Sequence, residues 1–237
     1  MKYKTELHAH TNEVSPCADL PANELAERYI AAGYTTVTVT NHYCDYVIDR
    51  AGKSWQEKCD HFLSGYRLMK EYAGDRLNVL LGCELRFTEN FNDYLIMGMT
   101  EEFLYEHPDL HHMTLKSFSA LARESGLLVV QAHPFRNGMT VMDPKYLDGV
   151  EVFNGHSGHH SRNYLADELS RRYGLIRTSG ADFHHPYHTA DVAGIITDTP
   201  ITSTEQLVSV LRSGDYTLIC RGPAAEHDGL CAMPAKK

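Results

Sequence analysis

The chain has 237 residues, 43% of them hydrophobic and 22% charged, which is the composition of a globular protein large enough for one α/β barrel. Its 22 basic and 31 acidic residues give a net charge of −9, so it lacks the basic surface expected of a protein that binds long nucleic acids. No apolar run reaches the roughly 18 residues of a membrane-spanning helix and no apolar signal segment is found, so we expect no membrane partner and a cytoplasmic location.

Strand-like and helix-like segments alternate along the chain. The predicted strands are β-branched or continuously apolar, and they cover residues 3–7, 35–40, 79–83, 94–97, 127–132, 149–153, 175–179, 192–196 and 217–220. The predicted helices carry apolar residues at helical spacing, and they cover about 21–32, 54–73, 114–125, 161–173 and 202–211. This alternation predicts βα units around a parallel sheet, and the number of strands favours an α/β barrel. We expect one domain over 1–221 and a flexible tail over 222–237, which is rich in glycine, proline and alanine.

Two histidines close the first predicted strand. His8 and His10 stand two positions apart, so their side chains point to the same face of a strand and can bind one metal ion together. Similar polar residues follow the ends of later strands: His42, Glu84, His133, Asn154, Asp182 and His184. Because the loops after the strands of an α/β barrel meet at one face, we expect these side chains to form a single site.

The strand-end residues combine imidazole and carboxylate groups, with no thiolate among them. Such ligands suit Zn²⁺, Mn²⁺ or Fe in a hydrolytic site that holds two or three divalent ions. A carboxylate such as that of Glu84 can bridge two ions about 3.5–4 Å apart, and a water between them becomes hydroxide at neutral pH. The pattern therefore predicts a multinuclear hydrolase.

Five motifs carry these residues, in order over about residues 5–185. They are Glu6-Leu7-His8-Ala9-His10-Thr11, Thr40-Asn41-His42, Gly82-Cys83-Glu84, Ala132-His133-Pro134 and Gly180-Ala181-Asp182-Phe183-His184. As a set they resemble the polymerase-and-histidinol-phosphatase (PHP) superfamily, which implies a distorted (β/α)7 TIM-like barrel with a two- or three-metal phosphoesterase site. The resemblance also groups the ligands: His8, His10, Glu84 and Asp182 for one ion, Glu84 and His133 for a second, His42 and His184 for a third.

Two positions depart from the pattern of that family. Members usually carry a histidine in the short strand after Glu84, where this chain has Asp93, either as a replacement ligand or as an ordinary loop aspartate. The family also supplies an aspartate or histidine in the first loop, where Glu13, Cys17 and Asp19 are available. We take Glu13 as the metal ligand, while Cys17 is alternatively an inert thiol and Asp19 is as well suited to begin the following helix.

Two arginines near the expected ligands are candidates for binding phosphate. Arg86 follows Glu84 by two residues and Arg136 follows His133 by three, and a guanidinium group can hold phosphate through two parallel hydrogen bonds. Both are alternatively ordinary surface arginines. His156 is expected to contact the substrate or to give a proton to the leaving group, unless it is an exposed histidine in a turn.

These observations lead to a metal-dependent phosphoesterase that hydrolyses a small phosphorylated substrate, a phosphate monoester. A metal-bridging hydroxide would attack phosphorus, and His156, Asp182 and His184 are the expected catalytic residues. A phosphodiesterase or nuclease acting on short oligonucleotides or cyclic phosphates is the alternative among enzymes. A regulatory PHP module that binds metal without catalysis is the alternative of another class, and the two irregular ligand positions motivate it.

Overall fold

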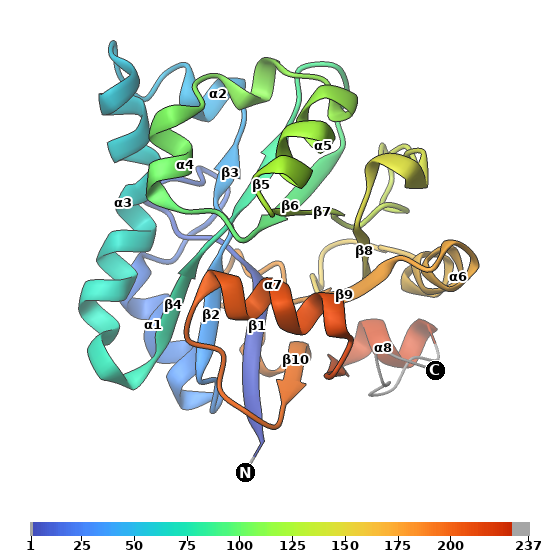
Figure 1. Cartoon of the computed structure of the whole chain (residues 1–237). Coiled ribbons are helices and arrows are strands. Elements are labelled where there is room, and N and C mark those ends of the chain that lie inside the picture. The colour runs from blue at the N-terminus through green and yellow to red at the C-terminus, as the bar shows by residue number, and fades with distance from the viewer. Residues whose placement is uncertain (1, 229–237) are drawn as a thin grey trace.

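The strands form two hydrogen-bonded sheets in the computed structural model, which describes residues 2–228 (Figure 1). The five-stranded sheet has the order β11 (Thr217–Cys220), β10 (Ala193–Thr197), β1 (Tyr3–Ala9), β2 (Thr36–Val39) and β4 (Asn78–Leu81). The six-stranded sheet has the order β3 (His42–Tyr43), β5 (Cys83–Arg86), β6 (Asp93–Met97), β7 (Leu128–Gln131), β8 (Gly149–Asn154) and β9 (Ile176–Gly180). The predicted mixed α/β fold is confirmed, and its division into seven β/α units stays a prediction.

Helices cover the sheets from several sides. They are α1 (Ala22–Ala31), α2 (Asp45–Ile48), α3 (Trp55–Ala73), α4 (Glu101–Glu106), α5 (Leu115–Glu124), α6 (Asn163–Tyr173), α7 (Thr204–Ser213) and α8 (Pro223–Asp228), with 3₁₀ turns η1 (Gly74–Arg76), η2 (Leu110–His112), η3 (Pro144–Tyr146) and η4 (Ala190–Val192). α1 packs on α3 beside β4, while α6 packs on β8 and also contacts α8, which lies below it in the view of Figure 1. Of the expected tail, residues 223–228 form α8, and residues 229–237 lie outside the described part. Among the helices that the structure describes, none is both long enough and apolar enough to cross a membrane.

α1 shows how local sequence sets the ends and the buried face of a helix. Pro21 precedes the first turn, where a missing N–H costs nothing. Leu25 and Tyr29 stand four positions apart and are fully buried against the core. Gly33 follows the helix with φ of 76°, a left-handed conformation that glycine adopts without steric cost. The predicted helix over 21–32 is therefore found with its ends displaced by one residue.

Two strands run against the predicted parallel direction. β6 pairs antiparallel with β5, because the connection over residues 87–92 is too short for the crossover that a parallel pair requires. β6 also pairs antiparallel with β7. β10 pairs antiparallel with β1 and with β11. The prediction of a wholly parallel sheet is wrong for these two strands. The pairs β1–β2, β2–β4, β3–β5, β7–β8 and β8–β9 are parallel, as predicted.

The carboxyl ends of several parallel strands meet where the two sheets come together. β4 passes into β5 at Gly82, where an added Cβ would lie 2.9 Å from Thr38 Cγ2 and 3.0 Å from the Ile96 carbonyl oxygen. Ala9, the last residue of β1, forms an isolated parallel bridge with Phe183, just after β9. These junctions place the residues that follow β1, β4 and β9 side by side.

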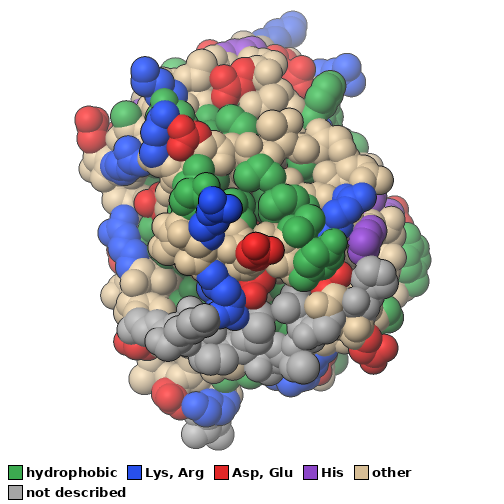
Figure 2. All heavy atoms as spheres, turned by 90° about the vertical axis from the view of Figure 1, so that its right-hand side faces the viewer, with side chains coloured by type: hydrophobic (Ala, Val, Ile, Leu, Met, Phe, Trp, Pro, Cys, Tyr) green, Lys and Arg blue, Asp and Glu red, His purple; other side chains and the backbone are tan. Residues whose placement is uncertain are grey.

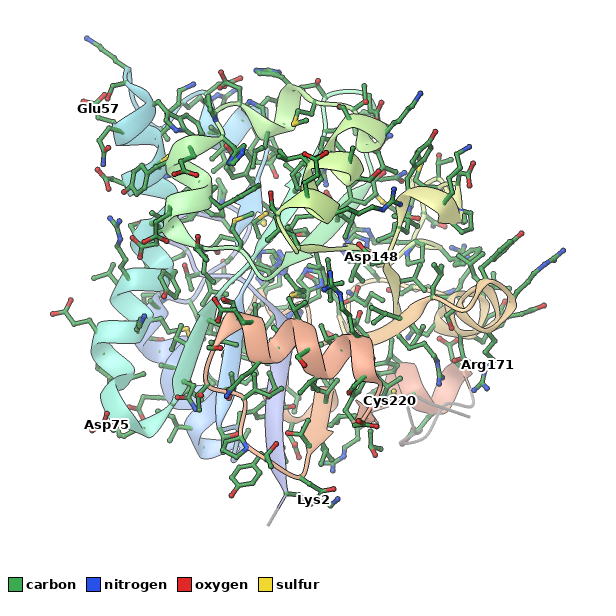
Figure 3. All side chains as sticks on the ribbon, viewed as in Figure 1. Lys2, Glu57, Asp75, Asp148, Arg171 and Cys220 are labelled. Carbon is green, nitrogen blue, oxygen red and sulfur yellow. The ribbon has the colours of Figure 1, made fainter. Side chains whose placement is uncertain are left out.

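Apolar side chains fill the space between the sheets and the helices. The largest fully buried ones include Tyr29, Phe62, Phe118 and Phe153. Many charged residues project outward, as the labelled Glu57, Asp75 and Arg171 show (Figure 3). On the face shown in Figure 2, basic and acidic side chains are interspersed with hydrophobic ones.

Candidate metal centre

Seven histidine and carboxylate side chains converge at the ends of five strands. β1 supplies His8 and the adjoining His10, β3 His42 and β5 Glu84, while His133 follows β7 and Asp182 and His184 follow β9. Each of the seven is less than a tenth exposed. The structure thus brings together the histidines and acids that stand at the predicted strand ends.

The carboxylate of Glu84 lies in the middle of this centre. Its Oε1 is 3.0 Å from His133 Nε2 and 3.4 Å from His8 Nε2. Its Oε2 is 2.9 Å from His42 Nδ1 and 3.4 Å from His10 Nε2. Each oxygen therefore faces two imidazoles, which is an arrangement suited to a carboxylate shared between two ions.

Asp182 closes the other side of the centre. Its Oδ1 lies 3.3 Å from the Nε2 atoms of His8 and His10 and 3.3 Å from His184 Nδ1. Three overlapping groups have ligand atoms within 4.8 Å of one another: His8, His10 and Asp182; His8, Glu84 and His133; His10, His42 and His184. These groups overlap with the three ligand sets that the family resemblance implies, and the number of ions stays a prediction.

A buried glutamate, Glu151 on β8, fixes the orientation of His8. Its Oε1 accepts a hydrogen bond from His8 Nδ1 at 2.8 Å, so the lone pair of His8 Nε2 is directed into the centre. Its Oε2 accepts from the His133 backbone N–H and from Asn154 Nδ2, both at 3.0 Å. The sequence interpretation missed Glu151, although a carboxylate inside the apolar strand 149–153 was the available signal.

Ser15 plays the corresponding part for His10. The Ser15 hydroxyl donates to Asn41 Oδ1 at 2.9 Å, so its oxygen accepts from His10 Nδ1 at 3.3 Å and from the His42 N–H at 3.1 Å. With its proton on Nδ1, His10 also turns the lone pair of Nε2 toward the centre. The first loop and β3 therefore hold the ligands of β1 in place.

The polar atoms at the middle of the centre fit divalent cations. His8 Nε2, His10 Nε2 and Glu84 Oε2 are shielded from solvent, and the described residues offer none of them a hydrogen-bond partner. Buried groups of this kind are costly unless something binds them. Imidazole nitrogens and carboxylate oxygens are ligands of Zn²⁺, Mn²⁺ and Fe, so such ions would satisfy all three atoms.

Two of these ligands stand on strained backbone. His133 has φ of 28° and Asp182 φ of 51°, in the left-handed region that side chains other than those of glycine, asparagine, aspartate and histidine rarely adopt. Each such residue costs about 1–3 kcal/mol and persists only where the surroundings impose it. The conformation turns both side chains inward directly after their strands.

Burial and neighbouring charges shift the pKa values of the ligands. Burial opposes ionisation of Glu84 and Asp182, but the adjacent His8 holds the pKa of both carboxyls well below the ordinary value. Burial lowers the pKa of His10 well below its usual range. Burial also opposes protonation of His8 and His42, yet the facing carboxylates raise the pKa of both rings, so cation binding would displace protons from them.

Glu6, a buried acid in the first motif, ties β1 to the segment after β9. Its Oε1 accepts hydrogen bonds from the backbone N–H groups of Leu7, His8 and Ala181, each at 2.9 Å. Burial raises the pKa of Glu6 to about 7, although these three donors act in the opposite direction. The sequence interpretation gave this residue no role beyond its place in the motif.

The stability of the metal-free protein is expected to depend on Glu6 between about pH 4.5 and pH 7. In this range the folded chain retains the Glu6 proton and the unfolded chain has released it, so stability falls as pH rises through it. The free energy of unfolding should fall by about 3 kcal/mol across this range because of Glu6, and Glu6→Gln should abolish that part of the fall. Urea unfolding at stepped pH measures it, with exposed Glu168→Gln as control. A difference between wild type and Glu6→Gln that stays constant across the range would contradict the expectation.

The structure does not bring Glu13 into the centre. Its Oε1 accepts from the Ala22 backbone N–H at 2.9 Å, so the carboxylate caps the N-terminus of α1, where free N–H groups favour a negative charge. Asp19 instead bonds His185 Nδ1 at 2.8 Å. The preference for Glu13 among the loop residues therefore lacks support from its contacts.

Among the three candidates Glu13, Cys17 and Asp19, Cys17 is the one that faces the ligands. It lines the same cavity as His42 and His184. Burial alone would raise the pKa of the thiol, but hydrogen bonds with His184 and His42 lower it to about 6. A thiolate in this position would be a sulfur ligand beside the imidazoles of His42 and His184.

Asp93 lies between the two arginines that were expected to bind phosphate. Arg86 bonds it through Nε at 2.7 Å and Nη2 at 2.8 Å, and Arg136 Nη2 lies at 3.2 Å. His133 Nε2 is 3.9 Å away. The shortest contacts of Asp93 are thus with guanidinium groups, which it holds in a fixed orientation.

One cavity of about 560 Å³ joins the ligands to these arginines. It is lined by Cys17, His42, Tyr46, Glu84, Arg86, Arg136, His156, Gly158, His159, Asp182, His184 and His185. A small anion in the cavity would lie between the metal ligands and two cationic side chains.

His156 lies inside this cavity rather than on an exposed turn. It is 7% exposed, and its backbone N–H donates to Asn154 Oδ1 at 3.2 Å. Burial lowers the pKa of His156 to about 3, so the ring is neutral at neutral pH. A neutral imidazole suits hydrogen bonding to substrate better than proton donation to a leaving group.

Solved structures share this fold at low sequence identity. A two-domain protein from Bacteroides vulgatus ATCC 8482, containing a predicted PHP-like metal-dependent phosphoesterase, matches with a TM-score of 0.67 and 14% identity over 93% of this chain. The chain spans 65% of that protein's length. PsfC from Pseudomonas syringae PB-5123 matches with a TM-score of 0.62 and 17% identity over 88% of each chain. An amidohydrolase from Chromobacterium violaceum, with bound sulfate and no metal, matches with a TM-score of 0.54 and 14% identity over 89% of this chain and 96% of its own.

A family model shows the protein family of the chain, whereas the solved structures, at this low identity, show only its fold. No curated protein matches the chain. The model of the PHP domain, however, matches residues 6–209, a span that includes the whole centre from His8 to His184. The chain therefore belongs to the PHP domain family.

Proposed function

We propose that the protein is a metal-dependent phosphatase that hydrolyses small-molecule phosphate monoesters, carried on a distorted (β/α)7 barrel. One observation supports this above the others. Glu84 and Asp182 line a cavity of about 560 Å³ together with Arg86 and Arg136. The solvent-shielded, unpartnered Nε2 atoms of His8 and His10 each lie 3.4 Å from an oxygen of Glu84. A site of that size, with cation ligands on one side and guanidinium groups on the other, suits a phosphate group and a small alcohol.

Two or three divalent ions, Zn²⁺, Mn²⁺ or Fe, are the proposed cofactors. His8, His10, Glu84 and Asp182 would hold one, Glu84 and His133 a second, and His10, His42 and His184 a third, with Cys17 in place of Glu13. Such ions lower the pKa of a bound water and offset the charge of phosphate. Glu151 and Ser15 keep the histidine lone pairs directed at the ions.

The chain's own residues would bind and orient the ester. Asp93 holds the Arg86 and Arg136 guanidinium groups beside the ligands, so their remaining N–H groups can take the phosphate oxygens. His156, neutral and buried, would donate a hydrogen bond to the substrate. The small cavity and the net charge of −9 disfavour long nucleic acids.

Metal analysis and a panel of esters test this proposal. We expect two or three ions per chain, fewer in Cys17→Ser, and phosphate release from p-nitrophenyl phosphate and small sugar or alcohol phosphates. Arg86→Leu should raise KM for the ester, because it removes a phosphate donor, whereas exposed Arg171→Leu should not. Faster cleavage of bis(p-nitrophenyl) phosphate would establish a diesterase instead. Metal binding without hydrolysis of any ester would establish a binding module.

A further inference from the structure

A second cavity of about 490 Å³ lies beside the first. His156, Gly158 and His159 line both cavities and form the wall between them. The second cavity is otherwise lined by polar groups that include His188 and Arg221, and by the apolar side chains of Val192, Pro223 and Ala224. A substrate whose phosphate occupies the first cavity could extend past the wall into the second.

Three histidines gather at this wall. His156, His185 and His188 each have a ring nitrogen within 4.8 Å of the other two, which by distance alone resembles a metal site. The hydrogen bonds of the rings argue otherwise. His156 Nδ1 accepts from the Gly158 N–H at 3.0 Å, and His188 Nδ1 accepts from the His184 N–H at 3.1 Å.

These two bonds fix the position of the ring protons. A backbone N–H can only donate, so the Nδ1 atoms of His156 and His188 carry no proton. The proton of each ring is therefore on Nε2, which makes Nε2 a hydrogen-bond donor and leaves neither nitrogen free to bind a metal. Each of these two rings therefore carries an Nε2–H group that can donate to an oxygen acceptor.

His188 supplies the clearest sign that an acceptor is missing. The residue is 7% exposed, and its Nε2 has no hydrogen-bond partner among the described residues. Asp19 bonds His185 Nδ1 at 2.8 Å and Asp191 bonds Arg221 Nη1 at 2.7 Å, so these two carboxylates are already paired with donors. The carboxylate that acts on His188 is that of Asp182, which belongs to the metal centre. Arg221 adds positive charge to the same cavity.

We propose that the second cavity is a subsite for an oxyanion on the leaving group of the substrate, a carboxylate or a second phosphate. The inference rests on the proposed function, because it assigns the substrate class of the same site: monoesters that carry a second anionic group. Nε2–H of His156 and His188 donates to the oxyanion, and Arg221 offsets its charge. The phosphate to be cleaved stays with Arg86 and Arg136 in the first cavity.

Matched substrates test the subsite. Propyl phosphate, 1,3-propanediol bisphosphate and 4-(phosphonooxy)butanoate differ in the group that would enter the second cavity. We expect wild type to prefer the two compounds with a second anionic group by about 10- to 100-fold in kcat/KM. His188→Phe should reduce that ratio to near one, whereas His61→Phe on α3 should keep it. Comparison of the bisphosphate with the carboxylate-bearing ester separates a phosphate site from a carboxylate site.

A second measurement uses the wild-type protein, so it tests the subsite even if His188→Phe does not fold. Long-range ¹H–¹⁵N spectra of the zinc-loaded full chain should show His156 and His188 protonated at Nε2, and inorganic phosphate should shift their Nε2–H resonances but not those of His61. An unprotonated Nε2, unshifted resonances or a wild-type ratio near one would each overturn the subsite. If no ester is hydrolysed with any metal, the proposed function fails. The phosphate-induced shift would then still support the oxyanion site.

Discussion

Glu84→Gln is expected to lower kcat/KM for phosphate release by about 10³-fold, which is ~4 kcal/mol of lost transition-state stabilisation. The glutamine keeps the size of the side chain but loses the charge that faces His8, His10, His42 and His133. Its amide group would also direct N–H donors at ring nitrogens that must bind cations. Metal content after dialysis should fall together with activity.

Glu168→Gln provides the matched control for this change. Glu168 is an exposed residue of α6, so the same substitution there should leave both metal content and kcat/KM at the wild-type level. Wild-type metal content in the Glu84→Gln protein would show that Glu84 is not a shared ligand. Full activity in that variant would reject the centre altogether.

Glu151→Gln is expected to weaken metal binding by about 10- to 100-fold without removing a ligand. Glu151 accepts from His8 on one oxygen and from His133 and Asn154 on the other. A glutamine has a single acceptor oxygen, so it cannot serve both sides. Either His8 loses the partner that fixes its tautomer, or the His133 N–H is left buried and unpaired at a cost of about 1–3 kcal/mol.

Metal titration separates this positioning role from a merely structural one. If Glu151 acts through His8, excess Mn²⁺ or Zn²⁺ should restore most of the activity of Glu151→Gln, because the ligands are still present. A variant that binds metal with wild-type affinity, as judged by competition with a chelator, would contradict the positioning role. Activity that excess metal cannot restore would point to a general loss of structure.

The helices and the centre were largely readable from the sequence because they rest on local signals. Helical spacing marked α1, α3, α5, α6 and α7 to within a few residues. The end of a strand is also a local feature, so residues such as His133 and Asp182 could be placed at one face before their neighbours were known.

Long-range contacts decided what the sequence could not show. Glu13 and Cys17 stand in the same loop. The contact with α1 shows that Glu13 caps that helix, and the shared cavity shows that Cys17 faces the ligands. The direction of β6 depends on the short connection over 87–92. The sequence around Glu151 indicates only a strand residue, because its role depends on the contact with His8 of β1.

The left-handed backbone at His133 and Asp182 restricts which residue types these two positions can accept. The residues that tolerate such φ values, namely histidine, aspartate, asparagine and glycine, include good metal ligands and exclude bulky β-branched side chains. Replacing His133 or Asp182 by glycine would remove a metal ligand and relieve the backbone strain at that position. An inactive variant of this kind would therefore be more stable than the active protein. Selection for the metal site therefore works against selection for stability at these two positions.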